Sequence, residues 1–123
     1  MIIGTGVDIT EVRRMKQAIE KWGEVFLSRI FTAQELDNAK TRGSLYQHLA
    51  GRFAAKEAIF KAMGEKNLGW KDVEIMNDEE GKPYCAILNH KLKKVNVHIS
   101  ISHIKNYAVA NAIITEKSHG AKI

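Results

Sequence analysis

Alternating apolar and polar residues predict strands near both ends of the chain. In residues 2–9, Val7 and Ile9 lie on one face of such a strand, while small or acidic residues lie on the other. Residues 97–102 alternate strictly, and a second β-branched run over 107–115 follows a short polar turn. Two strands joined in this way predict a β-hairpin. Both ends of the sequence are therefore expected to form strands.

Helical spacing of apolar residues predicts three helices between these strands. Residues 11–22 carry apolar side chains every three or four positions, with basic side chains among them. We expect this helix to end at Gly23. Thr32 and Glu35 match a capping box, in which each side chain satisfies a free backbone donor, so a short helix begins directly after Thr32. The longest pattern, 44–63, is apolar around most of its surface, and a glycine follows that can end it. We expect this last helix to be central.

A turn-rich segment separates the long helix from the closing hairpin. It predicts two short strands, 73–76 and 83–87, on either side of an acidic turn, and a short basic helix over 89–94. The fold class is therefore α+β, a small single domain with a long central helix packed on an antiparallel sheet. We expect the domain to cover 1–118, with 119–123 as a loose C-terminal tail.

Composition narrows the class of protein. The chain has 123 residues, which is the length of one domain. Its residues are 45% hydrophobic and 27% charged, a composition that excludes a disordered or low-complexity chain. The single cysteine, Cys85, cannot form an internal disulfide, which favours a reducing compartment. The N-terminus lacks the basic region of a signal peptide, and no apolar run approaches the ~20 residues that span a bilayer. We expect a cytoplasmic protein with no membrane partner.

The net charge of +5 favours an anionic partner, but it does not distinguish a nucleic acid, a membrane surface, a nucleotide and an acidic protein. One alternative is a basic nucleic-acid-binding module without enzymatic activity, in which two Trp and three Tyr stack on bases. That alternative leaves the acidic residues described below without a role, and no nucleic-acid-binding motif is recognisable. We therefore expect no nucleic acid as partner.

Asp8 is the first candidate for chemistry, because it follows two glycines in the first strand. The glycines do not complete a dinucleotide-binding GxGxxG, since Ile9 takes the place of the third. An acid at a strand end beside glycines is a suitable Mg²⁺ ligand with room for a diphosphate. The alternative is that Asp8 caps the helix that follows.

Charged residues within the apolar central helix are the second candidate. Burying ionised groups is costly unless they are paired or bound to a ligand. Glu57 and Lys61 lie about 40° apart on the helix surface, so they form either an i,i+4 salt bridge or part of a binding site. Lys56 falls within the apolar stripe, where its stem can extend so that the ammonium reaches solvent.

The remaining candidates favour structural roles when taken alone. His103 shares strand parity with three apolar residues, which favours a hydrogen-bonded core histidine. Trp22 and Trp70 are interpreted as anchors of the core or of loops. No Cys/His cluster has the spacing of a structural zinc site.

Three segments, in this order along the chain, resemble the motifs of the 4'-phosphopantetheinyl transferase family. They are IGTGVDI at 3–9, FAAKEAIFK at 53–61 and ISH at 101–103, and the middle one is the most specific. Two further segments, FTAQEL at 31–36 and GKPY at 81–84, resemble the small bacterial members of the family. The resemblance covers nearly the whole chain.

The resemblance implies the 4'-phosphopantetheinyl transferase fold and a catalytic domain. Such an enzyme moves the 4'-phosphopantetheine arm of coenzyme A to a serine of apo acyl carrier protein, releases adenosine 3',5'-bisphosphate and supports fatty acid biosynthesis. The catalytic residues would be Asp8, Glu57 and Lys61, with Mg²⁺ bound by the two acids and the diphosphate charge balanced by Lys61. The base that deprotonates the serine stays open among Glu57, a water held by Glu57 or by the metal, and Lys61. By the same resemblance, coenzyme A would be held by Arg52, Lys61, Gly64, Pro83 and His103.

The resemblance also implies partners. It predicts a homotrimer with active sites at the subunit interfaces. Acyl carrier proteins of this type are small and acidic, so the basic first helix is a candidate docking face through charge complementarity. The alternative is an ordinary solvated helix face. The candidate docking residues are Arg13, Arg14, Lys21 and, beyond the predicted helix, Arg29.

Overall fold

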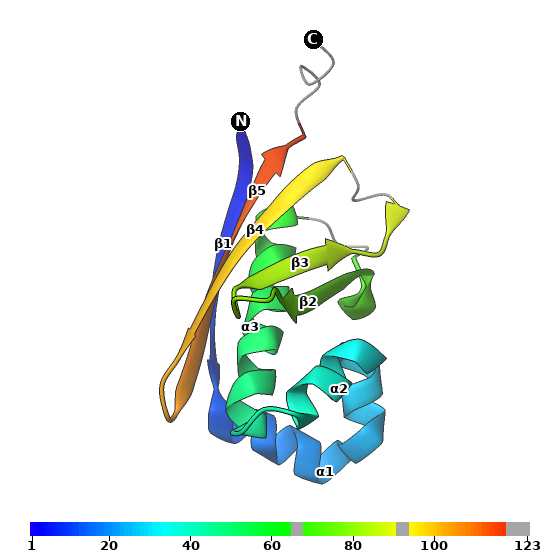
Figure 1. Cartoon of the computed structure of the whole chain (residues 1–123), viewed down its shortest axis with the longest axis vertical. Helices are drawn as coiled ribbons and strands as arrows, with labels where there is room; N and C mark the ends of the chain where they lie inside the picture. The colour runs from blue at the N-terminus through cyan, green and yellow to red at the C-terminus, as the bar shows by residue number, and fades with distance from the viewer. Residues whose placement is uncertain (65–67, 91–93, 118–123) are drawn as a thin grey trace.

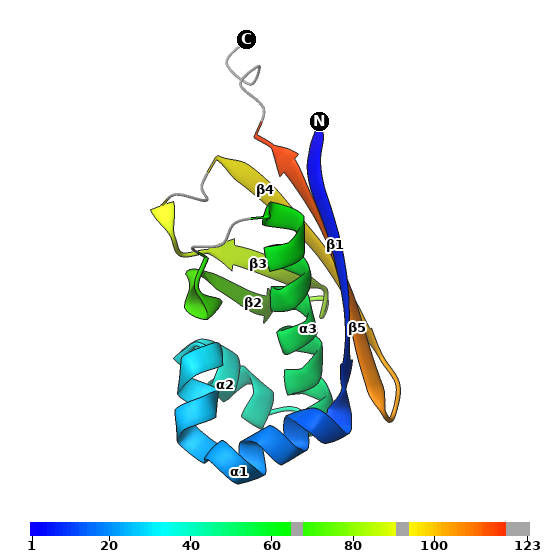
Figure 2. The same ribbon diagram turned by 180° about the vertical axis from the view of Figure 1, so that it is seen from behind.

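The longest helix, α3 (Leu45–Met63), runs through the middle of the computed structural model, which describes residues 1–64, 68–90 and 94–117. A three-stranded antiparallel sheet covers one side of α3, as Figures 1 and 2 show. The strand order in this sheet is β1 (Ile2–Glu11), β5 (Tyr107–Glu116) and β4 (Val95–His103). The predicted fold class, a central helix on an antiparallel sheet, is therefore confirmed.

The other elements pack around the rest of α3. The predicted pair of short strands is confirmed as an antiparallel hairpin, and the closing hairpin pairs as expected. The remaining elements are α1 (Val12–Ile30), α2 (Ala33–Lys40), the short 3₁₀ helix η1 (Trp70–Asp72), β2 (Val73–Asn77) and β3 (Pro83–Ile87). Residues 91–93 of the predicted basic helix, and the predicted tail 119–123, lie outside the described residues. Within the described part of the chain, no helix is long and apolar enough to cross a membrane.

Two glycines allow β1 to lie directly against α3. A Cβ at Gly4 would collide with the carbonyl oxygen of Ala62, and one at Gly6 would collide with that of Ala58. Both obstacles are backbone atoms of a helix, which cannot rotate away as a side chain can. The absence of a side chain at these positions therefore sets the separation of β1 and α3. It also brings Asp8, the next residue on this face, close to the helix.

The opposite face of the sheet is uncovered and partly apolar. Val7 and Ile9 are 59% and 66% exposed, and in both Figure 1 and Figure 2 no helix or strand covers this side. The register places Ile9 opposite Val109, so apolar side chains continue from β1 to β5. The large exposed apolar residues on this face are Ile3, Val7, Ile9, Tyr107 and Val109. Contiguous exposed apolar surface of this kind is typical of interaction sites.

The first helix departs from the prediction at Gly23. There the backbone takes φ 56° and ψ −134°, and helix then resumes to Ile30, so Gly23 kinks α1 where we expected it to end. Trp22, beside the kink, is 57% exposed, so its interpretation as an anchor of the core is wrong. Trp70 does act as an anchor, since its ring lies 5.1 Å from that of Phe53 and packs edge-on against that of Phe60.

The capping box at the start of α2 is confirmed. The Glu35 amide donates to Thr32 Oγ1 at 3.2 Å, and the Thr32 amide donates to Glu35 Oε1 at 2.8 Å. Gly64, in the left-handed conformation with φ 63°, ends α3 as expected. Local sequence signals thus determine the start of one helix and the end of another.

Lys56 is completely buried, which corrects the expectation that its ammonium reaches solvent. Its Nζ lies 2.8 Å from Glu35 Oε1 and donates to the carbonyl oxygens of Ile30, Trp70 and Val73 at 2.8–3.2 Å. Burial lowers the pKa of Lys56, and the Glu35 carboxylate opposes that change. Because Glu35 Oε2 also accepts from the Ile75 amide at 2.7 Å, this pair ties α1, α2 and β2 to the central helix.

Candidate active site

Asp8, Glu57 and Lys61 line one cavity between β1, α1 and α3. The cavity has a volume of about 490 Å³. Glu11 and Arg14 also line it, together with apolar side chains that include Met15, Phe26 and Phe53. The structure therefore brings together the three residues that the sequence suggested for catalysis.

Lys61 contacts Asp8 directly. Its Nζ lies 3.1 Å from Asp8 Oδ1 and donates to the Val7 carbonyl oxygen at 3.1 Å. Asp8 Oδ2 accepts from Thr10 Oγ1 at 3.1 Å. Asp8 does not cap α1, so the capping alternative is wrong. The alternative of an i,i+4 salt bridge between Glu57 and Lys61 is also wrong, because Lys61 pairs with Asp8 instead.

The environment of the site raises the pKa of Glu57. Burial raises its pKa, the charge of Asp8 raises it further, and Lys61 opposes the change. Two carboxylates that repel each other beside a cavity form a suitable pair of ligands for a divalent cation. No group of three or more His, Cys, Asp or Glu side chains forms a candidate metal site within 1–64, 68–90 and 94–117. Two acids nevertheless fit Mg²⁺, which usually takes one or two carboxylates and completes its shell with waters and substrate phosphates.

A second cavity, of about 220 Å³, contains three of the other predicted binding residues. It is lined by Arg52, Pro83 and His103, with His48 and Arg42 beside them. His103 is exposed at the end of β4, so the alternative of a core histidine is wrong. Gly64 lines neither cavity.

Arg52 is only 2% exposed and is fixed by three hydrogen bonds. Its Nε donates to His48 Nε2, and its Nη2 donates to the side-chain oxygens of Asn38 and Asn77, all at 2.7 Å. Its Nη1 is buried and has no partner among the described residues. Burial, with the positive charge of Arg42 adding to it, lowers the pKa of Arg52 to about 10, although Glu35 opposes the change. A buried donor without an acceptor is costly, so Nη1 is suited to bind a ligand.

The two cavities lie on different sides of the same helix. At 100° per residue, Arg52 is about 140° from Glu57 and about 180° from Lys61 around α3. The cavities share no lining residue. The residues predicted for one binding site are therefore divided, within a single chain, into an acidic half on the β1 side and a basic half on the β2–β3 side.

The candidate docking residues are all exposed along α1. Only Arg14 reaches the acidic half, where it lines the cavity and its Nε lies 3.5 Å from Glu11 Oε1. Arg13, Lys21 and Arg29 do not line that cavity.

Sequence reasoning missed the three residues that hold Arg52. A signal for His48 was available, because it precedes Arg52 by one helical turn and so shares its side of α3. Asn38 and Asn77 lie 14 and 25 residues away in the sequence, and no local pattern connects them to Arg52.

Comparison with known proteins defines the class first. The family model of the 4'-phosphopantetheinyl transferase superfamily matches residues 4–112, and the chain belongs to this superfamily. Among curated relatives, the holo-[acyl-carrier-protein] synthase of Halothermothrix orenii is 43% identical over 118 residues, 89% of this chain and 94% of the relative. That of Thermodesulfovibrio yellowstonii is 45% identical over 116 residues, 94% of this chain and 100% of the relative. The predicted family and transferase class are confirmed.

Solved structures give the same result for the fold. The holo-(acyl-carrier-protein) synthase of Bacillus anthracis, in complex with CoA (3',5'-ADP), has a TM-score of 0.82 and 40% identity, covering 95% of this chain and 99% of its own. The enzyme of Neisseria meningitidis has a TM-score of 0.83 and 33% identity, covering 95% and 100%. The family fold is therefore confirmed.

Proposed function

We propose that this chain transfers the 4'-phosphopantetheine arm of coenzyme A to a serine of apo acyl carrier protein, as the names of its relatives imply. The observation that carries the proposal is the convergence of Asp8, Glu57 and Lys61 on one cavity. Two carboxylates and one ammonium group match the needs of transfer from a diphosphate to a hydroxyl. The products are holo carrier protein and adenosine 3',5'-bisphosphate.

The reaction forms one bond and breaks another at a single phosphorus. The serine oxygen attacks the phosphorus next to pantetheine, and the bond from this phosphorus to the bridging oxygen breaks. The serine proton passes to a Glu57 carboxylate oxygen, directly or through one water. Lys61 stabilises the negative charge that develops on the leaving phosphate. Mg²⁺, when bound by Asp8 and Glu57, supplies further positive charge at the diphosphate.

The division of the site supports active sites at subunit interfaces, and the family resemblance implies that the assembly is a homotrimer. Coenzyme A would lie between the acidic half of one copy and the basic half of the next, held there by Arg52, Lys61, Pro83 and His103. The uncovered apolar face of the sheet supports association of this kind, because it leaves Val7 and Ile9 exposed. Light scattering should then give three times the 13.8 kDa chain mass, about 41 kDa.

Mixing two inactive variants tests the interfacial site. In Glu57→Gln the basic half is intact, and in Arg52→Ala the acidic half is intact. If equal amounts of the two variants exchange subunits at random, about one quarter of the sites combine two intact halves. Activity near that fraction supports interfacial sites. A mixture no more active than its components contradicts them.

The basic face of α1 would dock the carrier. The exposed basic residues along this helix are Arg13, Arg14, Lys21 and Arg29, and Arg14 also lines the catalytic cavity. An acidic protein attracted to this helix would be guided toward the cavity that holds Glu57. We further propose that the reaction runs in the cytoplasm and serves fatty acid biosynthesis. The single cysteine, which needs no oxidising compartment, supports that location.

Intact mass spectrometry of the carrier tests the proposed function. A candidate apo carrier is incubated with this protein, coenzyme A and Mg²⁺, and it should gain about 340 Da, the mass of one phosphopantetheine arm. Excess EDTA should abolish the gain, and equal modification in EDTA contradicts the metal site. Asp8→Asn and Glu57→Gln should lower kcat even at saturating Mg²⁺. An unmodified carrier under all conditions contradicts the transferase function.

A further inference from the structure

The basic half of the site contains a charged group held by neutral acceptors. A guanidinium has five N–H donors, and three of those of Arg52 are used by His48, Asn38 and Asn77. The two on Nη1 are left over, although the side chain is almost completely buried. The bonds to Nε and Nη2 fix the plane of the guanidinium and its rotation. Nη1 is therefore a donor that is held in place before any ligand arrives.

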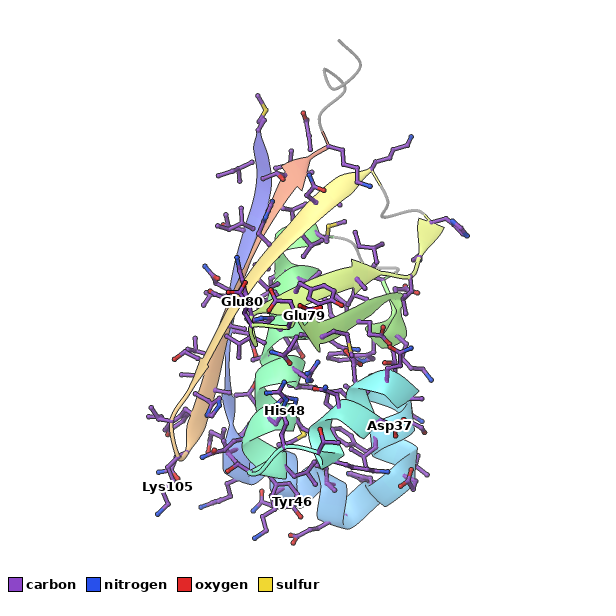
Figure 3. The ribbon with its side chains drawn as sticks, viewed as in Figure 1. Asp37, Tyr46, His48, Glu79, Glu80 and Lys105 are labelled. Carbon is purple, nitrogen blue, oxygen red and sulfur yellow. The ribbon has the colours of Figure 1, made fainter. Side chains whose placement is uncertain are left out.

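His48 can hold Arg52 only in one protonation state. The hydrogen bond requires Nε2 to accept, so the imidazole is neutral and carries its proton on Nδ1. The groups that act on its charge are all basic: Arg52 on the same helix, Arg42 before α3 and His103 at the end of β4. Burial, followed by the positive charges of Arg52 and Arg42, lowers the pKa of His48 to about 4. Figure 3 labels His48 on α3, level with α2.

We propose that His48 is a positioning residue, whose neutral imidazole acts with Asn38 and Asn77 to hold Arg52 so that Nη1 binds a phosphate of the nucleotide end of coenzyme A. The inference rests on the proposed function, because that function supplies the ligand. His48 acts through Arg52. Its loss should therefore weaken binding of the nucleotide and leave the chemical step, which takes place in the acidic half of the site, nearly unchanged.

Two substitutions separate the hydrogen bond from packing. His48→Gln keeps an acceptor that can reach Arg52 Nε and removes the titratable group. His48→Leu removes the acceptor and replaces the imidazole with an apolar side chain of similar size. We expect His48→Leu to weaken binding about tenfold, the effect of losing one hydrogen bond to a charged group, and His48→Gln to stay within about threefold of the parent protein.

The first measurement is calorimetric titration of the full chain with adenosine 3',5'-bisphosphate, without metal or carrier. It is paired with steady-state kinetics, in which KM for coenzyme A should rise in His48→Leu while kcat and KM for the carrier change less than about twofold. Equal binding by the parent protein and His48→Leu overturns the inference. So does equal weakening in both variants, because that pattern indicates packing.

The second measurement needs no variant. In the parent protein at about pH 5.5, an ordinary histidine is mostly protonated, whereas the ¹⁵N shifts of His48 should show a neutral ring with Nε2 unprotonated. A fully protonated ring at that pH overturns the inference even if His48→Leu does not fold. Failure of the proposed function has a different signature. If the parent protein binds the nucleotide and carrier is never modified, the transferase proposal fails alone; if nothing binds, both fail.

Discussion

Lys56→Met should destabilise the protein strongly, because it leaves the Glu35 carboxylate buried without its cation. Glu35 and Lys56 are both completely buried and lie 2.8 Å apart. Removing one partner of such a pair costs about 3–5 kcal/mol. Two backbone donors, the amides of Thr32 and Ile75, still donate to Glu35. We therefore expect the loss in free energy of unfolding to be near 3 kcal/mol, the lower end of that range. A chain of this length has roughly 6–18 kcal/mol of stability in total.

Urea denaturation followed by circular dichroism measures this loss, at one fixed chain concentration because association contributes to stability. The matched control is Glu35→Gln with Lys56→Met, which removes both charges. The free energy of unfolding of this double variant should be at least about 1 kcal/mol higher than that of Lys56→Met alone, because no unpaired charge is then left buried. A loss below about 1 kcal/mol in Lys56→Met, or a double variant no more stable than the single one, refutes the reasoning.

Three further substitutions test other parts of the account. Gly6→Ala should lower the free energy of unfolding by about 3 kcal/mol or more, because the added methyl group meets the backbone of α3. Thermal or urea unfolding measures this loss. The control is Gly43→Ala, where a Cβ has open space and the free energy of unfolding should change by less than about 0.5 kcal/mol. Lys61→Ala should keep its circular dichroism spectrum and lose about 100-fold or more in kcat, whereas a lysine that served only as a surface ion pair would leave kcat intact. Arg14→Glu should raise KM for the carrier about tenfold at low salt, with KM for coenzyme A nearly unchanged, and the effect should shrink at ~0.5 M salt, where the Debye length is about 4 Å. A carrier KM that responds to neither the charge reversal nor salt would show that α1 is an ordinary solvated helix.

Features set by neighbouring residues could be predicted from the sequence. The capping box of Thr32 and Glu35 requires only four consecutive residues, and it forms as expected. Strand alternation also identified the glycine face of β1, although the reason for the glycines, contact with the α3 backbone, lies more than 50 residues away. The kink at Gly23 was missed because a glycine after an apolar pattern is consistent with either a stop or a bend.

Features set by distant residues could not be predicted. The partner of Lys56 is Glu35, on another helix 21 positions earlier, and a pattern within α3 cannot reveal it. The FAAKEAIFK motif is continuous in sequence, yet the adjacent Arg52 lies on the opposite side of α3 from Lys61. Helical geometry alone would have shown this separation. Its consequence for binding became clear only when the two cavities could be compared.

The central claim is transfer of phosphopantetheine from coenzyme A to a carrier serine. Its most direct test is a single reaction in which holo carrier and adenosine 3',5'-bisphosphate are quantified together, with the parent protein and with Lys61→Ala. We expect one molecule of bisphosphate for each carrier that gains about 340 Da, with the added mass on a serine, and almost no product with Lys61→Ala. Bisphosphate released without modified carrier, or product formed equally well by Lys61→Ala, would contradict it.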